Sequence, residues 1–358
     1  MLISRTAPPW LDDESALVIV DWSWWLNKAF RIGGIDGMTS SVIGWLTSHV
    51  LADHPAHLAL ALDATGETHR HRREHPTDPG WRYKAGRDPK PADFYTIAER
   101  CTQIAELHAI PVLWADRYEA DDVIATATAK ARAAGYRVWI CSADKDLHAL
   151  VSDDPKSGVT VGTWDNFEGT WRGPEEVRTH YGVEPAQMAD FLAIWGDSGD
   201  NIPGAEGLGK IAAADILRAW GDLESALAAP VYTPENFAAA EGHAKALAKR
   251  IKITSDPDAR AKLEAERAEV MRVRKLAKAH HVLVQHADLV RFSRTLTALD
   301  CDAPVRMPWN DLPVGGFHAA ELRQRYLDLG YTQKAQQVPS FPKRAPWCVP
   351  YEDDTAAA

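Results

Sequence analysis

Cysteine is scarce in this sequence, and its spacing excludes two kinds of site. The 358 residues include four cysteines, Cys101, Cys141, Cys301 and Cys348, and no two of them form a Cys-x-x-Cys pair. A cysteine-based zinc site and a disulfide framework both need paired or regularly spaced cysteines. We therefore expect reduced thiols, as in a cytosolic protein.

Long apolar runs and excess positive charge are missing as well. No stretch approaches the ~20 apolar residues of a membrane-spanning helix, and the N-terminus lacks the basic-then-apolar pattern of a secretory leader. We expect a soluble intracellular protein without a membrane partner. The net charge of −10 argues at first against a nucleic-acid partner, because the phosphate backbone attracts lysine and arginine.

Short apolar runs alternate with helical patterns along the first half of the chain. The runs occupy residues 16–20, 57–62 and 137–141, and helical patterns occupy residues 94–109 and 120–134. Short apolar runs are typical of buried parallel strands. Strands that alternate with helices predict an open, mostly parallel α/β sheet flanked by helices.

Carboxylates follow each of the three predicted strands. Asp21 and Asp63 come directly after the first two strands, and Asp144 and Asp146 follow the third. Ligands of open α/β sheets bind outside the carboxyl ends of the strands. We therefore expect these side chains to gather at one edge of the sheet.

A further acidic trio, Glu119, Asp121 and Asp122, opens the predicted helix at 120–134. Taken singly, such acids are more readily explained as helix caps or as favourable charges in a first turn. Converging on one edge, so many like charges would repel unless cations lay among them. Oxygen ligands without His or Cys indicate Mg²⁺ or Mn²⁺ rather than zinc, and two such ions can clamp a phosphodiester.

The glycine-rich segment 196–209 contains Asp197 and Asp200 and precedes another helical pattern. Glycines let a backbone approach a phosphate, and the N–H groups of a helix N-terminus attract anions. An ordinary helix–turn–helix hairpin explains the same spacing equally well. With these two residues the candidate acids number nine, which accounts for nearly all of the net charge. The acidic balance is therefore weak evidence against a nucleic-acid partner.

A basic excursion interrupts the α/β pattern at residues 64–92. It holds seven Lys/Arg against four Asp/Glu, and four prolines. A long segment of this kind on an α/β scaffold more often has a function than serves only as a connection.

Six motifs follow one another in a fixed order along the chain. They are VDWS at 20–23, LDATG at 62–66, YKAGR at 83–87, RYEADDVIA at 117–125, SADKDLHALV at 142–151 and WGDSGDNIPG at 195–204. In this order and spacing they resemble the 5′-nuclease (flap endonuclease) family, which includes the 5′–3′ exonuclease domain of bacterial DNA polymerase I and free-standing phage enzymes. The resemblance covers about residues 16–225 and returns weakly near 290–305 and 316–331.

The resemblance implies a domain organisation. Residues 1–182 would form a PIN-like α/β nuclease domain that includes a helical arch at 64–100. Residues 183–335 would form the helix–three-turn–helix and a C-terminal helical DNA-binding region, and residues 336–358 would form a tail.

The resemblance also implies metal ligands, because all nine acidic positions of the family pattern are occupied. The inner site would comprise Asp21, Asp63, Glu119, Asp121, Asp144 and Asp146. The second metal and the outer shell would be completed by Asp122, Asp197 and Asp200. The expected cofactors are two Mg²⁺ ions, for which Mn²⁺ would substitute.

The family's basic arch maps onto residues of the excursion. Lys84 and Arg87 would reach the scissile phosphate, Tyr83 would stack on a base, and Arg70 with His71 would lead into the arch and bind DNA. A solvated surface helix is the alternative for Lys84 and Arg87.

The segment 196–220 resembles the family's helix–three-turn–helix, which grips duplex DNA and often holds K⁺. Gly204, Gly207, Gly209 and Lys210 would contact DNA. The family usually reads Gly-x-Gly-x-Lys-Thr-Ala, whereas this chain reads GLGKIAA, so the lysine is displaced by one and the threonine is absent.

These features predict a metal-dependent 5′–3′ exonuclease or flap endonuclease in which Asp21, Asp144, Lys84 and Arg87 are catalytic. Its partners would be DNA with a 5′ flap, nick or free 5′ end, RNA–DNA hybrids, and a separate DNA polymerase in replication and repair. We expect a cytoplasmic monomer, in a bacterial cell or a phage-infected host. The alternatives are a non-catalytic branched-DNA-binding protein, which would lack several of the carboxylates, and a PIN-type ribonuclease, which would lack the glycine hairpin and arch.

Two weaker signals lie in the second half of the chain. His280, His281 and His286 fall on one predicted helix, where a core or surface position is favoured over a metal site. Basic residues cluster on the helical patterns at Lys245, Lys249, Arg250, Lys252, Arg272, Arg274, Lys275 and Lys278. These faces are equally consistent with solvation and with contact to duplex phosphates.

Overall fold

The chain divides into two compact units, each described by itself. The computed structural model describes residues 13, 15–47, 56–153, 160–165, 167–231, 234–310, 312 and 319–338. Unit 1 comprises residues 1–72, 88–177 and 299–358, and unit 2 comprises residues 73–87 and 178–298. The predicted tail lies outside the described residues from residue 339 onward, and so does Cys348.

A seven-stranded sheet forms the centre of unit 1. Its strands are β1 Ala16–Asp21, β2 His57–Ala61, β3 Val112–Leu113, β4 Arg137–Cys141, β5 Ser152–Asp153, β6 Thr160–Asp165 and β7 Thr170–Arg172. Their order is β3-β2-β1-β4-β6-β5, with β7 beside β6. Neighbouring strands in the series β3, β2, β1, β4 and β6 are parallel, while β5 and β7 pair antiparallel with β6. The mostly parallel sheet predicted from the sequence is confirmed.

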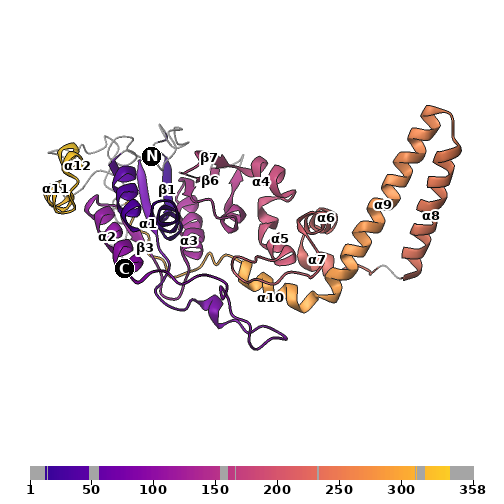
Figure 1. Ribbon diagram of the computed structural model, residues 1–358, viewed down its shortest axis with the longest axis horizontal. Coiled ribbons are helices and arrows are strands. Elements are labelled where there is room, and N and C mark those ends of the chain that lie inside the picture. Colours follow the sequence, from indigo (N-terminus) through magenta and orange to yellow (C-terminus); the bar gives the residue numbers. More distant parts are fainter. Residues whose placement is uncertain are drawn as a thin grey trace, which may run out of the picture. The chain divides into compact units, whose positions relative to one another are not determined.

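Helices cover both faces of this sheet (Figure 1). The helices of unit 1 are α1 Trp22–Trp45, η2 His69–Arg72, α2 Ala92–Leu107, α3 Ala120–Ala133, η3 Asp146–Leu150, α11 Ala319–Asp328 and α12 Thr332–Gln337, while α4 Pro174–Tyr181 crosses the boundary between the units. Of these, α1 and α2 lie on one face of the sheet and α3 on the other. Among the described residues, no helix combines the length and apolarity needed to cross a membrane.

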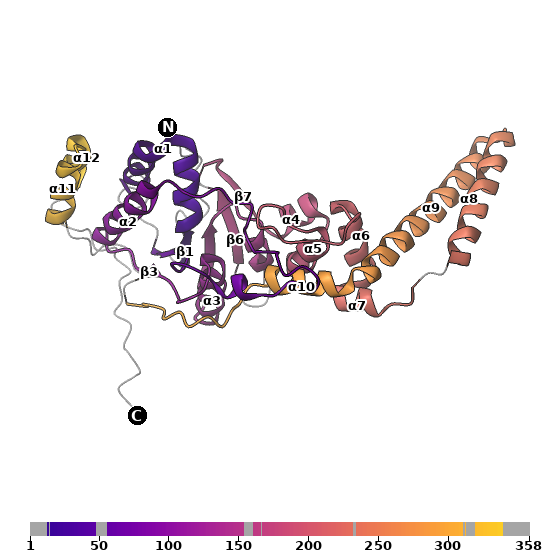
Figure 2. The ribbon, with the colours of Figure 1, turned by 60° about the horizontal axis from the view of Figure 1, so that its bottom comes forward.

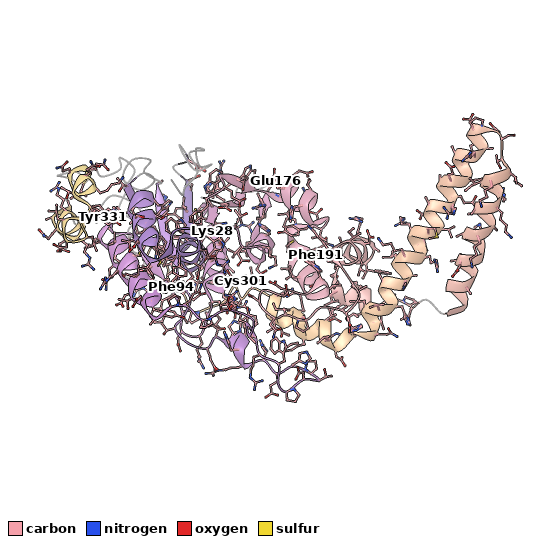
Figure 3. All side chains as sticks on the ribbon, in the orientation of Figure 1. Lys28, Phe94, Glu176, Phe191, Cys301 and Tyr331 are labelled. Atoms are coloured by element: carbon pink, nitrogen blue, oxygen red, sulfur yellow. The ribbon has the colours of Figure 1, made fainter. Side chains whose placement is uncertain are left out.

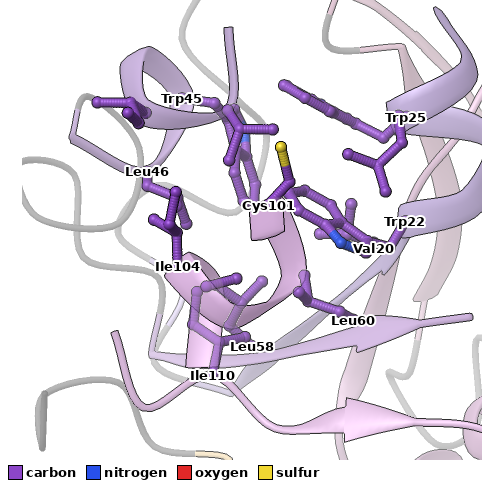
Figure 4. Packing of buried hydrophobic residues seen from close by; sticks show 14 of the residues in the cluster. Val20, Trp22, Trp25, Trp45, Leu46, Leu58, Leu60, Cys101, Ile104 and Ile110 are labelled. Atoms are coloured by element: carbon purple, nitrogen blue, oxygen red, sulfur yellow. The ribbon is translucent and has the colours of Figure 1, made fainter. Parts of the chain in front are cut away.

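Residue alternation along the strands builds two cores. Val18 and Val20 of β1 face a cluster with α1 and α2, whereas Leu17 and Ile19 face a second cluster with α3. Figure 4 shows the first cluster, which includes Trp22, stacked on its neighbour Trp25 at 5.3 Å between ring centroids. Because all of β1 is buried, its carboxyl end is fixed against both layers.

Unit 2 is helical. Its elements are η4 Pro185–Gln187, α5 Met188–Trp195, α6 Lys210–Trp220, α7 Leu223–Ala228, α8 Pro234–Ile253, α9 Pro257–Gln285 and α10 Ala287–Thr297. Helix α5 packs against α10 and α6, and its Phe191, labelled in Figure 3, is fully buried. Helices α8 and α9 lie side by side as a long hairpin (Figure 2).

The predicted core position of a histidine on α9 is confirmed. His280 is buried, its ring stacks on Trp220 at 4.4 Å, and its Nε2 lies 2.6 Å from the carbonyl oxygen of Ala226.

The compact units divide the chain differently from the expected domains in two places. The arch predicted at 64–100 is helical only in η2 and in α2, because prolines interrupt the segment between them at Pro76, Pro79, Pro89 and Pro91. Its residues 73–87 belong to unit 2 rather than to the α/β unit. Conversely, residues 319–338 belong to unit 1, where Leu322 and Tyr326 join the core beside α2.

Candidate active site

Asp21 ends β1 and caps α1, so one residue serves both the strand end and the helix start. Its Oδ1 accepts the Trp24 backbone N–H at 2.9 Å, and its Oδ2 accepts the Ser142 hydroxyl at 2.9 Å. The side chain is almost fully buried. Burial, followed by the nearby charges of Asp63 and Asp144, raises the pKa of Asp21 to about 8.

Asp63 and Glu119 meet at the start of α3. The Asp63 Oδ1 accepts the Ala120 backbone N–H at 2.8 Å, so a carboxylate from the end of β2 satisfies an N–H of the first helical turn. Glu119 is the residue before α3, and its Oε1 accepts the Thr68 hydroxyl at 3.3 Å. These bonds fix the carboxyl end of β2 to the N-terminus of α3.

Asp144 and Asp146 follow β4 in a tight turn. The Asp144 backbone N–H donates to the Ser142 hydroxyl oxygen at 3.0 Å, and the Asp146 backbone N–H donates to the Asp144 Oδ1 at 3.1 Å. Both side chains are partly buried. The turn therefore presents two carboxylates at the strand end next to β1.

Asp121 shows that these groups lie close together. Its pKa is raised well above the ordinary value, first by burial and then by four carboxylates, Asp144, Asp21, Asp146 and Glu119. Six of the nine predicted acids thus converge in unit 1, at the carboxyl ends of β1, β2 and β4.

Asp122, the neighbour of this cluster, has a different environment. It is fully buried and forms a bidentate ion pair with Arg70, at 2.5 Å to Nη1 and 2.7 Å to Nη2. It also contacts the His69 Nε2 at 3.1 Å and accepts the Asp300 backbone N–H at 2.9 Å. Burial alone would raise its pKa, but the hydrogen bonds from His69 and Arg70 hold the pKa below its ordinary value.

The environment of Asp122 bears on two predicted roles. Both oxygens of Asp122 are already engaged by nitrogen donors, those of Arg70 among them, so this carboxylate fits the predicted outer shell rather than direct contact with a metal ion. Arg70 is 2 % exposed, which leaves its guanidinium no access to DNA. Next to it, His71 is half-buried, and its Nδ1 accepts the Thr68 backbone N–H at 3.2 Å.

The remaining two acids lie in the glycine-rich loop of unit 2. Asp197 and Ile202 form an antiparallel bridge through backbone hydrogen bonds of 2.9 and 2.8 Å. The Asp197 Oδ1 accepts the Gly199 backbone N–H at 3.1 Å, and Asp200 is buried. The loop is therefore a closed turn that fixes both carboxylates.

Within unit 2, Asp200 holds the residues predicted to act on the phosphate. Arg87 donates to its Oδ1 through Nη2 and, at 3.1 Å, through Nε; the Lys84 Nζ lies 3.9 Å from its Oδ2. Tyr83 donates to the same oxygen at 3.1 Å. Burial opposes the charge of Asp200, but Lys84 and Arg87 outweigh it and lower the pKa.

The backbone of the basic segment is docked on the same loop. The Lys84 backbone N–H donates to the Asp200 carbonyl at 2.9 Å, and Trp81 Nε1 donates to the Asn201 carbonyl at 2.8 Å. Lys84 and Asn201 both adopt left-handed φ angles, 58° and 56°, a strained conformation that clusters at functional sites. Tyr83 is only 5 % exposed, so the predicted stacking of its ring on a base does not fit its position.

The glycines of the hairpin have two distinct roles. A Cβ on Gly204 would lie 2.5 Å from the Trp195 carbonyl carbon, so this glycine is required by packing. A Cβ on Gly207 or Gly209 would have no described heavy atom within 4 Å, which leaves the N-terminus of α6 open to a ligand. The Lys210 Nζ lies 4.8 Å from the centre of the Tyr181 ring.

Ser142 is the residue that the sequence reasoning missed. Its hydroxyl donates to Asp21 and accepts from the Asp144 backbone, so it ties two strand-end carboxylates together. Its position directly after β4 and two residues before Asp144 was the available signal.

Two adjacent family models match the chain. The 5′–3′ exonuclease N-terminal resolvase-like domain matches residues 19–182, and the 5′–3′ exonuclease C-terminal SAM fold matches residues 183–281. The chain belongs to the 5′ nuclease family. The family predicted from the six motifs is confirmed.

Curated relatives of this 5′ nuclease family member include DNA polymerases I. The chain is 27 % identical to the Bacillus caldotenax enzyme over 335 residues, which cover 91 % of this chain and 33 % of that one. It is 41 % identical to the thermostable Thermus thermophilus enzyme over 145 residues, which cover 40 % of this chain and 16 % of that one. The chain thus spans about a third or less of the length of these relatives.

A solved structure with a similar fold is the T5 D15 protein co-crystallised with metal ions. The TM-score is 0.53 at 17 % sequence identity, and the match covers 90 % of this chain and 99 % of the T5 protein. At this identity the likeness is one of fold. The α/β domain followed by a helical part, as predicted, is confirmed.

Proposed function

We propose that this chain is a metal-dependent, structure-specific 5′ nuclease that hydrolyses phosphodiester bonds near the 5′ ends of DNA. The observation that supports this proposal best is the convergence of six carboxylates at adjoining strand ends of unit 1. Membership of the 5′ nuclease family supports the reaction type. The convergence also favours an enzyme over a non-catalytic DNA-binding protein.

The donor set of unit 1 fits hard divalent cations. All six candidate ligands are carboxylates, without His or Cys, which favours Mg²⁺, with Mn²⁺ as a substitute. The raised pKa values of Asp21 and Asp121 are those of desolvated, closely spaced acids in need of a neutralising charge. When bound, two divalent ions would supply an activated water and would stabilise the charge on the phosphate.

The protein's own contribution is to hold its carboxylates in place and to bring positive charge to the phosphate. Ser142 and the start of α1 orient Asp21, while Asp63 is oriented by the start of α3. Lys84 and Arg87 would offset the charge that develops on the phosphate. Both contact Asp200 in this structure, and a DNA phosphate would take over as their anionic partner.

We propose that duplex DNA is gripped at the N-terminus of α6. The backbone N–H groups there lie beside Gly207 and Gly209, where a phosphate can approach closely. K⁺ bound to hairpin carbonyls would assist. The substrates would be flapped, nicked or free 5′ ends, including RNA primers on DNA, handled by a monomer that works alongside a separate polymerase.

Cleavage by an Asp144→Ala variant tests this proposal. On a 5′-labelled flap substrate with Mg²⁺, the rate should fall by more than roughly 100-fold, because even indirect metal partners are commonly worth 10–100-fold. Asp116→Ala, which removes an exposed acid of unit 1, is the matched control and should cleave normally. An Asp144→Ala variant that cleaves at the wild-type rate would refute the metal-site assignment. Product mapping on flapped, nicked and RNA-primed duplexes would define the substrate.

A further inference from the structure

The hairpin of α8 and α9 has an apolar seam and two polar sides. The seam contains Ala244 and Leu247 of α8 and Leu263 of α9, all buried. Three residues join the two helices, so they run antiparallel. Residues flanking the seam on either side are exposed along most of the hairpin.

Two ion pairs between the helices define the two sides. Glu241 of α8 pairs with Arg274 of α9 at 2.9 Å, and His243 pairs with Glu266 at 3.2 Å. Glu241 and His243 are two residues apart, which is about 200° around a helix. The pairs therefore lie on opposite sides of the seam and show which flank of α8 adjoins which flank of α9.

Most of the positive charges of the hairpin fall on the side of the Glu241–Arg274 pair. Residues three, four, seven or eleven positions apart lie on the same side of a helix. Positions 245, 249 and 252 of α8 therefore form one row, or stripe, with Glu241. Positions 260, 267 and 278 of α9 form a stripe with Arg274. We call these residues the basic side: Lys245, Lys249, Lys252, Arg260, Arg267, Arg274 and Lys278. The same two stripes contain or adjoin two acids, Glu241 and Glu264. The opposite side has Arg250, Lys262 and Arg272 beside three acids, Asp258, Glu266 and Glu269, of which Glu269 pairs with Arg272.

Several cations of the basic side are available to a partner. Within the described part of the chain, Lys249, Lys252, Arg267 and Lys278 form no salt bridge, and all four are exposed. In a chain whose net charge is −10, such a concentration of positive charge is local. A partner with regularly spaced negative charge fits it.

We propose that the basic side of the α8–α9 hairpin binds the sugar–phosphate backbone of duplex DNA, outside the helix–three-turn–helix. From Arg260 to Lys278 the row is about 27 Å long at 1.5 Å per residue. This length corresponds to about 8 base pairs at 3.4 Å per step. At the base of the hairpin, Lys275 lies 3.8 Å from Asp215 of α6, so the surface adjoins the helix that opens at the glycine turn. The inference rests on the proposed function, because DNA is the proposed substrate.

Two matched double variants test the inference. Lys249→Gln/Arg267→Gln removes two charges from the basic side, and Arg250→Gln/Lys262→Gln removes two from the opposite side. All four residues are exposed and belong to no salt bridge among the described residues, so both variants should fold and carry the same net charge. The measurement is the Kd for a 40-base-pair DNA duplex between 50 and 200 mM salt, with thermal unfolding as a check.

The basic-side variant should bind at least about tenfold more weakly at 50 mM salt. Its salt dependence, the slope of log K against log salt, should flatten by about 1.8, because each phosphate contact contributes about 0.9. The opposite-side variant should match the wild type. Equal weakening in both variants would mean that binding depends on net charge rather than on the basic side. No weakening in either variant would mean that the basic side does not bind duplex DNA and serves a different partner. Each result overturns the inference.

Single-turnover cleavage at saturating DNA separates this inference from the proposed function. Both variants should cleave at the wild-type rate there, because none of the four residues belongs to the carboxylate site. If the wild-type chain cleaved no DNA, the proposed function would fail, while the difference in duplex binding between the variants would still decide the role of the hairpin.

Discussion

Replacing Arg70 with alanine separates a structural role from a DNA-binding one. The family resemblance assigns Arg70 to DNA, whereas the structure buries it against Asp122 through two charge-assisted hydrogen bonds of 2.5 and 2.7 Å. Arg70→Ala would leave a fully buried carboxylate without its main cationic partner. We expect this variant to lose stability before any loss of DNA contact.

The size of the effect follows from the burial of both groups. Breaking a buried ion pair by removing one partner costs about 3–5 kcal/mol, because the remaining charge stays desolvated. The total stability of a typical domain is roughly 5–15 kcal/mol. With a urea dependence of about 2 kcal/mol per molar, the unfolding midpoint of unit 1 should fall by about 2 M.

Urea unfolding followed by tryptophan fluorescence measures this effect, since Trp22, Trp25 and Trp45 are buried in the core of unit 1. Arg72→Ala is the matched control, because Arg72 lies on the same short helix but is exposed. Its midpoint should change by an amount equivalent to no more than about 0.5 kcal/mol.

A second substitution tests the cause. Adding Asp122→Asn to Arg70→Ala removes the buried charge, so the double variant should be more stable than Arg70→Ala alone. The reasoning is refuted if Arg70→Ala unfolds at the wild-type midpoint and instead weakens duplex binding. That result would return Arg70 to the DNA-binding residues.

Two further predictions concern pH and the glycine hairpin. Burial lowers the pKa of His108 from its ordinary 6.5 to about 3, so the unfolded chain takes up a proton that the folded chain resists. The free energy of unfolding should therefore decrease as pH falls below about 6.5, and His108 should contribute up to about 1.4 kcal/mol of this decrease per pH unit. Urea unfolding between pH 7 and 5 measures the decrease, which should be smaller in His108→Gln. Gly204→Ala should destabilise the protein by about 1–3 kcal/mol through overpacking, whereas Gly209→Ala, whose added methyl meets no described atom, should unfold normally but bind duplex DNA less tightly. Equal unfolding midpoints for the two glycine variants would contradict this assignment.

The strand and carboxylate pattern was accessible from the sequence. Short apolar runs predicted β1, β2 and β4 within a residue or two, and parallel strands present their carboxyl ends at one edge. Asp21, Asp63 and Asp144 follow those ends, so their convergence was implied by local pattern alone.

Long-range pairing was not accessible in the same way. Arg70 and Asp122 are 52 residues apart, and Arg87 and Asp200 are 113 apart, with no local pattern that links them. The sequence therefore grouped Asp122 with the metal ligands and Arg70 with the DNA contacts. The prolines that prevent a helical arch between η2 and α2 were visible, but the family resemblance favoured a helix there.

The sequence by itself determined which acids stand at strand ends, which helices form and which family the chain belongs to, because these depend on local periodicity and ordered motifs. Only the tertiary structure decided which carboxylates remain together as a cluster and which are neutralised by an arginine, as Asp122 is. It also decided which cations of α8 and α9 share a side, because the packing of two helices brings together residues that periodicity alone places on separate elements. Burial next to a distant partner, rather than residue type, sets the role of each charged group.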